Sequence, residues 1–119
     1  MSAPIQIKRV YDKASPEDGM RILVERLWPR GVTKARAKID LWLKDIAPSA
    51  ELRKWFVHDP VKSEEFKKRY WDELRQNRPA VKNLRAYMKK GNVTYVYAAP
   101  DEKHNGALAL RDYLTQKKF

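Results

Sequence analysis

The spacing of apolar and polar residues predicts three strands. Residues 5–11 alternate between apolar and polar side chains and are rich in β-branched types, as in a half-buried strand. Residues 20–27 contain the continuous apolar run Ile22-Leu23-Val24, which is typical of a strand covered on both faces of a parallel sheet. Residues 93–98 form a third run of apolar and aromatic side chains. The pattern therefore indicates a small, mostly parallel sheet.

Elsewhere the apolar residues recur every three or four positions, which predicts helices that pack one side against this sheet. Ser49 and Asp59 are favourable N-cap residues, and Pro60 suits the first helical position after its cap. We expect helices at about residues 49–57, 59–77 and 78–90, and a last helix that begins at Asn105.

Residues 33–46 fit two patterns. Ile39, Trp42, Leu43 and Ile46 have helical spacing, whereas alternate apolar positions from residue 35 to residue 43 have strand spacing. We predict a helix over the last part of this segment and leave residues 33–38 unassigned.

The length of 119 residues fits one domain, residues 1–119, with no internal repeat or linker. The fold class that follows is α/β: a single domain with a small three-strand, mostly parallel sheet and about five helices packed around it. The expected core residues are Ile22, Val24, Phe66, Leu74, Val96 and Leu110.

Cysteine is absent from the chain, which excludes disulfides, thiolate nucleophiles and Cys-ligated zinc. The two histidines, His58 and His104, do not have a recognisable metal-ligand spacing, and no glycine-rich phosphate loop is present. We therefore expect no metal and no cofactor. Residues 1–4 open no apolar signal region, and no apolar run is long enough to span a bilayer, so a cytoplasmic location without membrane attachment is expected.

The net charge of +11 makes anionic partners the first class to consider. Many of the Lys and Arg residues lie in the predicted helices of residues 59–90. They could follow nucleic-acid phosphates without reading sequence, or they could form an ordinary solvated surface with pairs such as Glu64–Lys68.

A more local hypothesis places an anionic ligand at the carboxyl ends of the strands, where open parallel sheets bind ligands. Arginine matches phosphate or carboxylate with two hydrogen bonds, and tryptophan offers a stacking face. The structural alternative is that Trp28 plugs the end of the sheet and that Arg26 pairs with Glu25 or Asp18. The candidate ligand-binding residues are Tyr11, Arg26, Trp28, Arg30 and Asn105.

His104 is the candidate catalytic residue. It precedes a predicted helix, with Asp101 and Glu102 nearby, and could be the acid/base of a hydrolase or transferase acting on the same anion. The alternative is an inert surface histidine. His58 precedes the Asp59 cap and is read as structural.

Several stretches resemble the YeaO-like family of domain of unknown function 488. Residues 18–31 are similar to the hallmark of that family, and the resemblance extends over about residues 5–114. The other matching stretches are Ala47-Pro48-Ser49, residues 52–56, His58-Asp59-Pro60, and His104-Asn105 after Tyr97-Ala98-Ala99.

The resemblance implies no established biochemical activity. The wider family carries a Cys-His-Arg sequence in the last loop, where this chain has His104-Asn105, so a thiol mechanism is excluded here. YeaO-like members often have Asp at the position of Glu25 and a second His at the position of Gly106. The glycine at position 106 weakens any proposal of a metal or a histidine pair.

Overall fold

A parallel sheet organises the fold. The computed structural model describes residues 5–57 and 59–116, and its four strands have the order β1-β4-β2-β3 with every neighbouring pair parallel. The bounds are Ile5–Arg9 for β1, Met20–Leu23 for β2, Leu41–Trp42 for β3 and Val93–Tyr97 for β4. Strand β4 pairs with both β1 and β2 and is buried along its whole length. The predicted α/β class is confirmed, with four strands instead of three.

The additional strand lies in the segment whose pattern was ambiguous. The prediction of a helix over the last part of residues 33–46 is wrong: the helix α1 spans only Lys34–Ala37 and ends at Lys38 in the left-handed conformation, with a φ of 50°. The chain then runs along the free edge of β2, where the Leu43 N–H donates to the Leu23 carbonyl at 3.0 Å. Pairing with an exposed strand edge outweighs the helical spacing of the apolar residues here.

Four longer helices follow. They are α2 (Ala50–Phe56), α3 (Ser63–Gln76), α4 (Arg78–Met88) and α5 (Gly106–Thr115). Single-turn 3-10 helices span Pro16–Asp18, Lys44–Ile46 and Pro60–Lys62. In the described parts of the chain, no helix combines the length and the apolar character that crossing a membrane requires.

Three predicted N-caps are confirmed. The Ser49 hydroxyl accepts from the Leu52 N–H at 3.1 Å, and the Asn105 side chain accepts from the Leu108 N–H at 2.9 Å. Asp59 accepts from the Val61 N–H, although it caps the short 3-10 turn that precedes α3. His58 lies outside the described residues.

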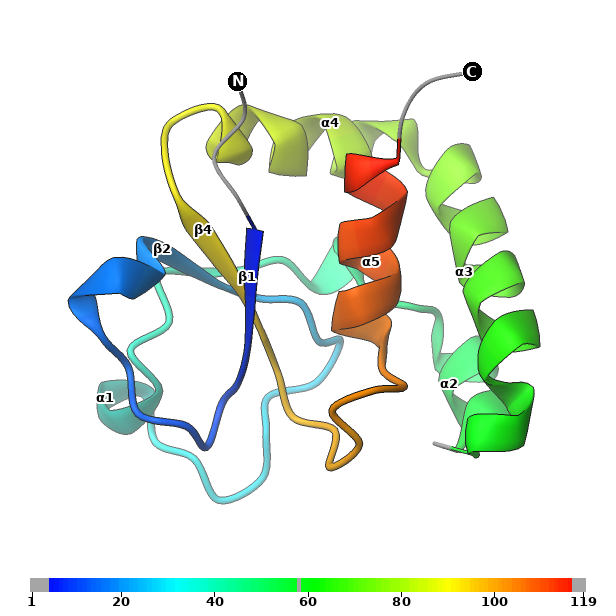
Figure 1. Ribbon diagram of the computed structural model, residues 1–119, viewed down its shortest axis with the longest axis horizontal. Helices are drawn as coiled ribbons and strands as arrows, with labels where there is room; N and C mark the ends of the chain where they lie inside the picture. Colours follow the sequence, from blue (N-terminus) through cyan, green and yellow to red (C-terminus); the bar gives the residue numbers. More distant parts are fainter. Residues whose placement is uncertain (1–4, 58, 117–119) are drawn as a thin grey trace.

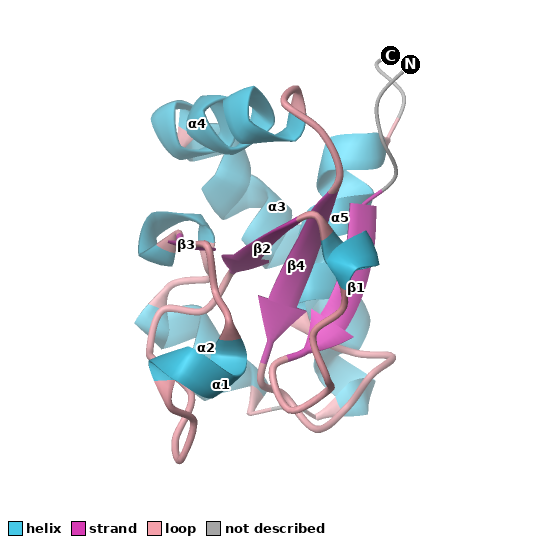
Figure 2. Ribbon diagram, turned by 90° about the vertical axis from the view of Figure 1, so that its left-hand side faces the viewer, coloured by secondary structure: helices cyan, strands magenta, loops and turns pink. Residues whose placement is uncertain are grey.

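The sheet separates two apolar clusters of unequal size. On one face Ile22, Val93, Tyr95 and Tyr97 pack against the helices, whereas on the other Leu23 and Val96 meet α1 and the segment around it. Figure 1 shows α5 and α3 on one side of the strands and α1 on the other, and Figure 2 shows α3 and α5 behind the sheet. All six residues of the predicted core are buried.

A buried ion cluster around Asp18 connects three strands of the sheet. The Asp18 carboxylate is 1% exposed and accepts from Arg21 Nη1 at 2.7 Å and from Lys8 Nζ at 2.9 Å. Burial alone would raise the pKa of Asp18, but the hydrogen bonds from Lys8, Ser15 and Arg21 outweigh it and hold the pKa well below its usual range. The Thr94 hydroxyl donates to the Asp18 carbonyl, so the cluster ties β1, β2 and β4 together.

Candidate functional site

Three loops meet at the carboxyl edge of the sheet. Because β1, β4 and β2 are parallel neighbours, the segments that follow Arg9, Leu23 and Tyr97 all lie at the same edge. In Figures 1 and 2 this is the lower edge, opposite α4. The candidate residues of the sequence analysis lie on these loops, but their side chains do not converge on one cavity.

Arg26 acts as a link between two loops. Its Nε donates to the Pro48 carbonyl at 3.1 Å, and its Nη2 donates to the Ala47 carbonyl at 3.0 Å. It lines a hollow of about 550 Å³ together with Asp45 and Asn77. The guanidinium therefore holds the segment before α2 against the end of β2, and its acceptors are backbone carbonyls, not the Glu25 or Asp18 side chains considered from the sequence.

Trp28 faces the side of the sheet that carries α1. Its indole N–H donates to the Val32 carbonyl at 2.6 Å, and its ring meets Trp42 edge to face with 5.5 Å between centroids. Arg30 is exposed two residues further on. Trp28 is thus part of the smaller apolar cluster, on a different face from Asn105 and α5.

Tyr11 lies in the turn that follows β1. It is 49% exposed, and the guanidinium of Arg9 lies 5.1 Å from the centroid of its ring. Arg9 Nε also donates to the Ala99 carbonyl at 3.1 Å. This pair fastens the loop after β1 to the loop after β4.

Asp101 organises the loop before α5. Its carboxylate accepts from the Lys103 and His104 N–H groups and lies 2.9 Å from His104 Nδ1, and these hydrogen bonds lower the pKa of Asp101. The Asn105 side chain donates to the Asp101 carbonyl while it caps α5. Asp101 thus orients the imidazole with Nδ1 toward the carboxylate.

A pocket that the sequence analysis did not identify opens at the same edge, between the end of β2, α2 and the start of α5. Its volume is about 460 Å³. We call it the strand-end pocket. Its lining residues are Val24, Glu25, Leu27, Pro48, Ala50, Arg53, Lys54, Phe56, Val57, Phe66, Ala99, Gly106 and Ala107.

The polar groups of the strand-end pocket come from three elements. Glu25 Oε2 accepts from the Ala98 N–H at 2.9 Å, which fixes the carboxyl group at the end of β4. Arg53 and Lys54 are exposed on α2, and within the described residues neither forms an ion pair. Asn105 caps the Leu108 N–H at the start of α5, and the next residues, Gly106 and Ala107, line the pocket.

Two apolar side chains at this pocket are unusually exposed. Leu27 is 64% exposed and Val57 is 65% exposed, and Val57 has a φ of 40°, a conformation that β-branched residues rarely adopt. Strained backbone of this kind is concentrated at functional sites. The sequence contained only a weak signal for this pocket. Leu27 follows a strand and Val57 follows a helix, and neither belongs to the periodic pattern of apolar residues.

The described residues contain no group of three or more His, Asp or Glu side chains that could hold a metal ion. The strand-end pocket combines apolar walls with a few polar groups. Pockets of a few hundred Å³ with apolar walls and a few polar groups are typical of small-molecule sites.

Comparison with known proteins assigns the chain to a family without a described activity. Residues 4–118 match the model of the inactive DUF488-N3 subclade. The chain is 46% identical over 110 residues to the uncharacterized protein YeaO of Escherichia coli strain K12, with 92% of this chain and 96% of the relative covered. It is 38% identical over 110 residues to uncharacterized proteins of Mycobacterium bovis and Mycobacterium tuberculosis, with 92% of both chains covered in each case. No solved structure matches the chain. The chain therefore belongs to the YeaO-like family of domain of unknown function 488.

Proposed function

We propose that the protein binds a small organic anion in the strand-end pocket, with the apolar part of the ligand inside and its anionic group at the edge. The observation that carries the proposal is the position of the pocket at the carboxyl ends of β2 and β4, where open parallel sheets bind ligands. The proposal retains the anionic ligand expected from the sequence but assigns it different residues.

The apolar part of the ligand would contact Phe56, Phe66, Pro48 and Leu27. Phe56 and Phe66 stack with 4.2 Å between ring centroids and form one wall. Covering the exposed side chain of Leu27 would remove apolar surface from water, which favours a ligand with an aromatic or aliphatic body.

The anionic group would contact Arg53 and Lys54. Both side chains line the pocket and are exposed, so a bound anion would meet donors that lack a carboxylate partner within the described residues. Arg26 and Trp28 are less suitable because Nε and Nη2 of Arg26 and the indole N–H of Trp28 already donate to backbone carbonyls. Glu25 also lines the pocket, and its carboxylate disfavours a second negative charge beside it.

Binding is favoured over catalysis. Among the described residues that line the strand-end pocket, none is Ser, Thr, Cys or His, and the carboxylate of Glu25, which could act as a base, already accepts from the Ala98 N–H. His104 is oriented by Asp101 as an acid/base histidine would be, yet it is not one of these lining residues. The matching subclade is also described as inactive.

The test is fluorescence titration of the folded protein with the dye ANS, an anilinonaphthalene sulfonate that joins an aromatic body to one anionic group. Arg53→Gln and Lys54→Gln should each weaken binding about tenfold, since a hydrogen bond to a charged group contributes roughly 1.5–3 kcal/mol. Ala50→Trp should block the mouth of the pocket. The matched control is Lys34→Gln, which removes one exposed charge from α1.

Equal affinities in wild type, the two charge variants and Ala50→Trp would contradict the proposal. Thermal unfolding in the same buffer is the accompanying measurement, because ANS also binds partly unfolded proteins. A ligand present at about 100 times its dissociation constant should raise stability by roughly 2.7 kcal/mol.

A further inference from the structure

A third hollow lies between α4, the end of α3 and α5, and we call it the basic groove. Its volume is about 970 Å³. Figure 1 shows α4 beside the amino ends of the strands. Val24, Glu25 and Ala99 of the strand-end pocket follow the carboxyl ends of β2 and β4, so the two hollows lie at opposite edges of the sheet. The residues of the groove are Leu74, Arg75, Arg78, Val81, Lys82, Arg85, Ala86, Lys89, Tyr113, Leu114 and Gln116.

The charged residues in the sequence around α4 are all cationic. Residues 74–100 contain six Lys or Arg and no Asp or Glu, so they contribute more than half of the net charge of +11. Four of these cations, Arg78, Lys82, Arg85 and Lys89, follow one another at intervals of four, three and four residues. That spacing gathers them on one side of the helix, and all four line the basic groove.

Among the described residues, the cations of α4 have no carboxylate partner. Within residues 5–57 and 59–116, no carboxylate lies within 4.0 Å of Arg78, Lys82, Arg85 or Lys89, whereas Arg75 at the end of α3 pairs with Asp72. Arg78 also occupies the first turn of α4, where the helix dipole disfavours a positive charge and where no acidic residue compensates. The arrangement costs stability in the free protein and is suited to an external anion.

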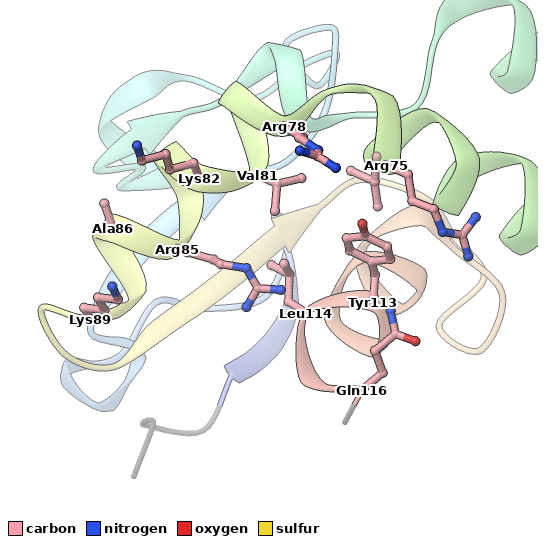
Figure 3. A pocket seen from close by; sticks show the side chains of 11 residues that line it. Arg75, Arg78, Val81, Lys82, Arg85, Ala86, Lys89, Tyr113, Leu114 and Gln116 are labelled. Atoms are coloured by element: carbon pink, nitrogen blue, oxygen red, sulfur yellow. The ribbon is translucent and has the colours of Figure 1, made fainter. Parts of the chain in front are cut away.

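The floor of the groove is apolar and aromatic. Val81, Leu114 and Tyr113 line it, and the Tyr113 ring is held edge to face by Trp71 with 5.6 Å between centroids. Figure 3 shows the guanidinium groups of Arg75, Arg78 and Arg85 around Tyr113 and Leu114. A ring held in this way beside cations is the kind of surface on which nucleic-acid bases stack.

We propose that the basic groove binds the phosphate backbone of single-stranded nucleic acid. The four cations of α4 extend over about 16 Å of helix, from eleven steps of roughly 1.5 Å, which exceeds what one phosphate group can reach. A flexible strand can follow a concave surface between helices and place a base on Tyr113, whereas the rigid rod of a duplex meets only its rim. Among the described residues that line the groove, Gln116 is the only one with a side-chain amide and none has a carboxylate, so few groups could read base edges and binding tolerates different sequences.

The experiment is fluorescence anisotropy with a labelled single-stranded oligonucleotide of mixed sequence, titrated with the full chain at several salt concentrations. With four phosphates neutralised, the logarithm of the binding constant should fall with the logarithm of salt with a slope of about −3. The double variant Arg78→Gln/Arg85→Gln should lower the affinity and reduce the size of this slope by about 1.4. Tyr113→Leu should weaken binding while leaving the slope unchanged.

The matched control is Lys34→Gln/Arg36→Gln, which also removes two exposed charges but on α1, away from the basic groove. It should retain both the affinity and most of the slope. An equal loss in the two double variants would overturn the proposal in favour of attraction by the whole surface. Tighter binding of the matching duplex, equal binding of polyglutamate, full competition by millimolar inorganic phosphate, or no binding at low salt would each overturn it as well.

Discussion

Arginines in two regions of the molecule are used in opposite ways. Arg21 in β2 and Arg26 in the loop after it donate to the backbone carbonyls of Ala37 and of Ala47 and Pro48, whereas Arg78 and Arg85 on α4 have no carboxylate partner in the described chain. The difference has a physical cause. Irregular segments leave carbonyls that need donors, whereas carbonyls inside a helix are already paired. A cation is therefore available to a ligand when its surroundings offer it neither a backbone acceptor nor a carboxylate.

The largest loss of stability should come from Asp18→Asn, which removes the carboxylate partner of the buried Arg21. The substitution keeps the shape of the side chain but leaves Arg21 and Lys8 without their anion. Removing one partner of a buried ion pair costs about 3–5 kcal/mol. Urea unfolding at neutral pH measures the loss, and an unchanged midpoint would show that Arg21 is held by the Ala37 and Lys38 carbonyls alone.

The stability difference between wild type and Asp18→Asn should depend on pH. Because folding lowers the pKa of Asp18, its contribution is present above the ordinary aspartate pKa of about 3.9 and is lost as the pH falls below that value. The stability difference between wild type and Asp18→Asn should accordingly be constant from pH 7 to pH 5 and shrink below about pH 4. Unfolding midpoints measured across this range provide the test, and a difference that grows in acid would contradict it.

A smaller loss is expected from Arg26→Met, which keeps much of the side-chain volume and removes both hydrogen bonds. The Ala47 and Pro48 carbonyls would lose their donors, and a buried acceptor left unpaired costs about 1–3 kcal/mol. Oligonucleotide affinity should be unaffected beyond the loss of one positive charge. If Arg26→Met weakened that affinity more than Arg78→Gln does, the division between structural and available arginines would be wrong.

Asn105→Ala should reduce the stability of the carboxyl edge by about 1 kcal/mol, the usual cost of losing an N-cap. The side chain caps α5 through the Leu108 N–H and also donates to the Asp101 carbonyl. Thermal unfolding measures the effect. Asn105→Asp serves as the control, because it keeps the cap while removing the donor.

The smallest effect, and the only one of opposite sign, is expected for Arg78→Gln. Removing a cation from the first turn of α4 should stabilise the protein by about 0.3–1 kcal/mol at low salt, and the gain should disappear at high salt. Lys89→Gln, at the other end of α4, should not stabilise it. A loss of stability in Arg78→Gln would show that this arginine makes a stabilising contact. Arg78 would then belong with Arg21 and Arg26 and would not be available to a ligand.

The sequence predicted the elements that depend on local chemistry. The strands around Ile22 and Val96 and the cap at Ser49 followed from apolar spacing and side-chain type, and the structure confirms them. Strand β3 could not be predicted, because two residues pair only through contact with the free edge of β2. Likewise, Arg26 could be placed at the end of β2, but its carbonyl partners belong to a segment about twenty residues away.

The strand-end pocket was missed for a related reason. Its walls combine Leu27, Pro48, Phe66 and Ala107, which lie on four separate parts of the chain, and no local pattern connects them. The basic helices of residues 59–90 were recognised as a charged surface. Their sequence could not show that the cations from Arg75 to Lys89 surround one groove, because that depends on how α4 packs beside α5.

The central position of β4 has a consequence for how the protein is made. Strand β1 pairs only with β4, and the register joins Ile5 to Val93, so the sheet closes over nearly the whole length of the chain. During synthesis, β1 and β2 emerge long before the strand that joins them. Non-local parallel pairing is slow, and unpaired apolar strands favour aggregation. We therefore expect β1 and β2 to remain without their shared partner until β4, which ends at Tyr97, has been made and has left the ribosome.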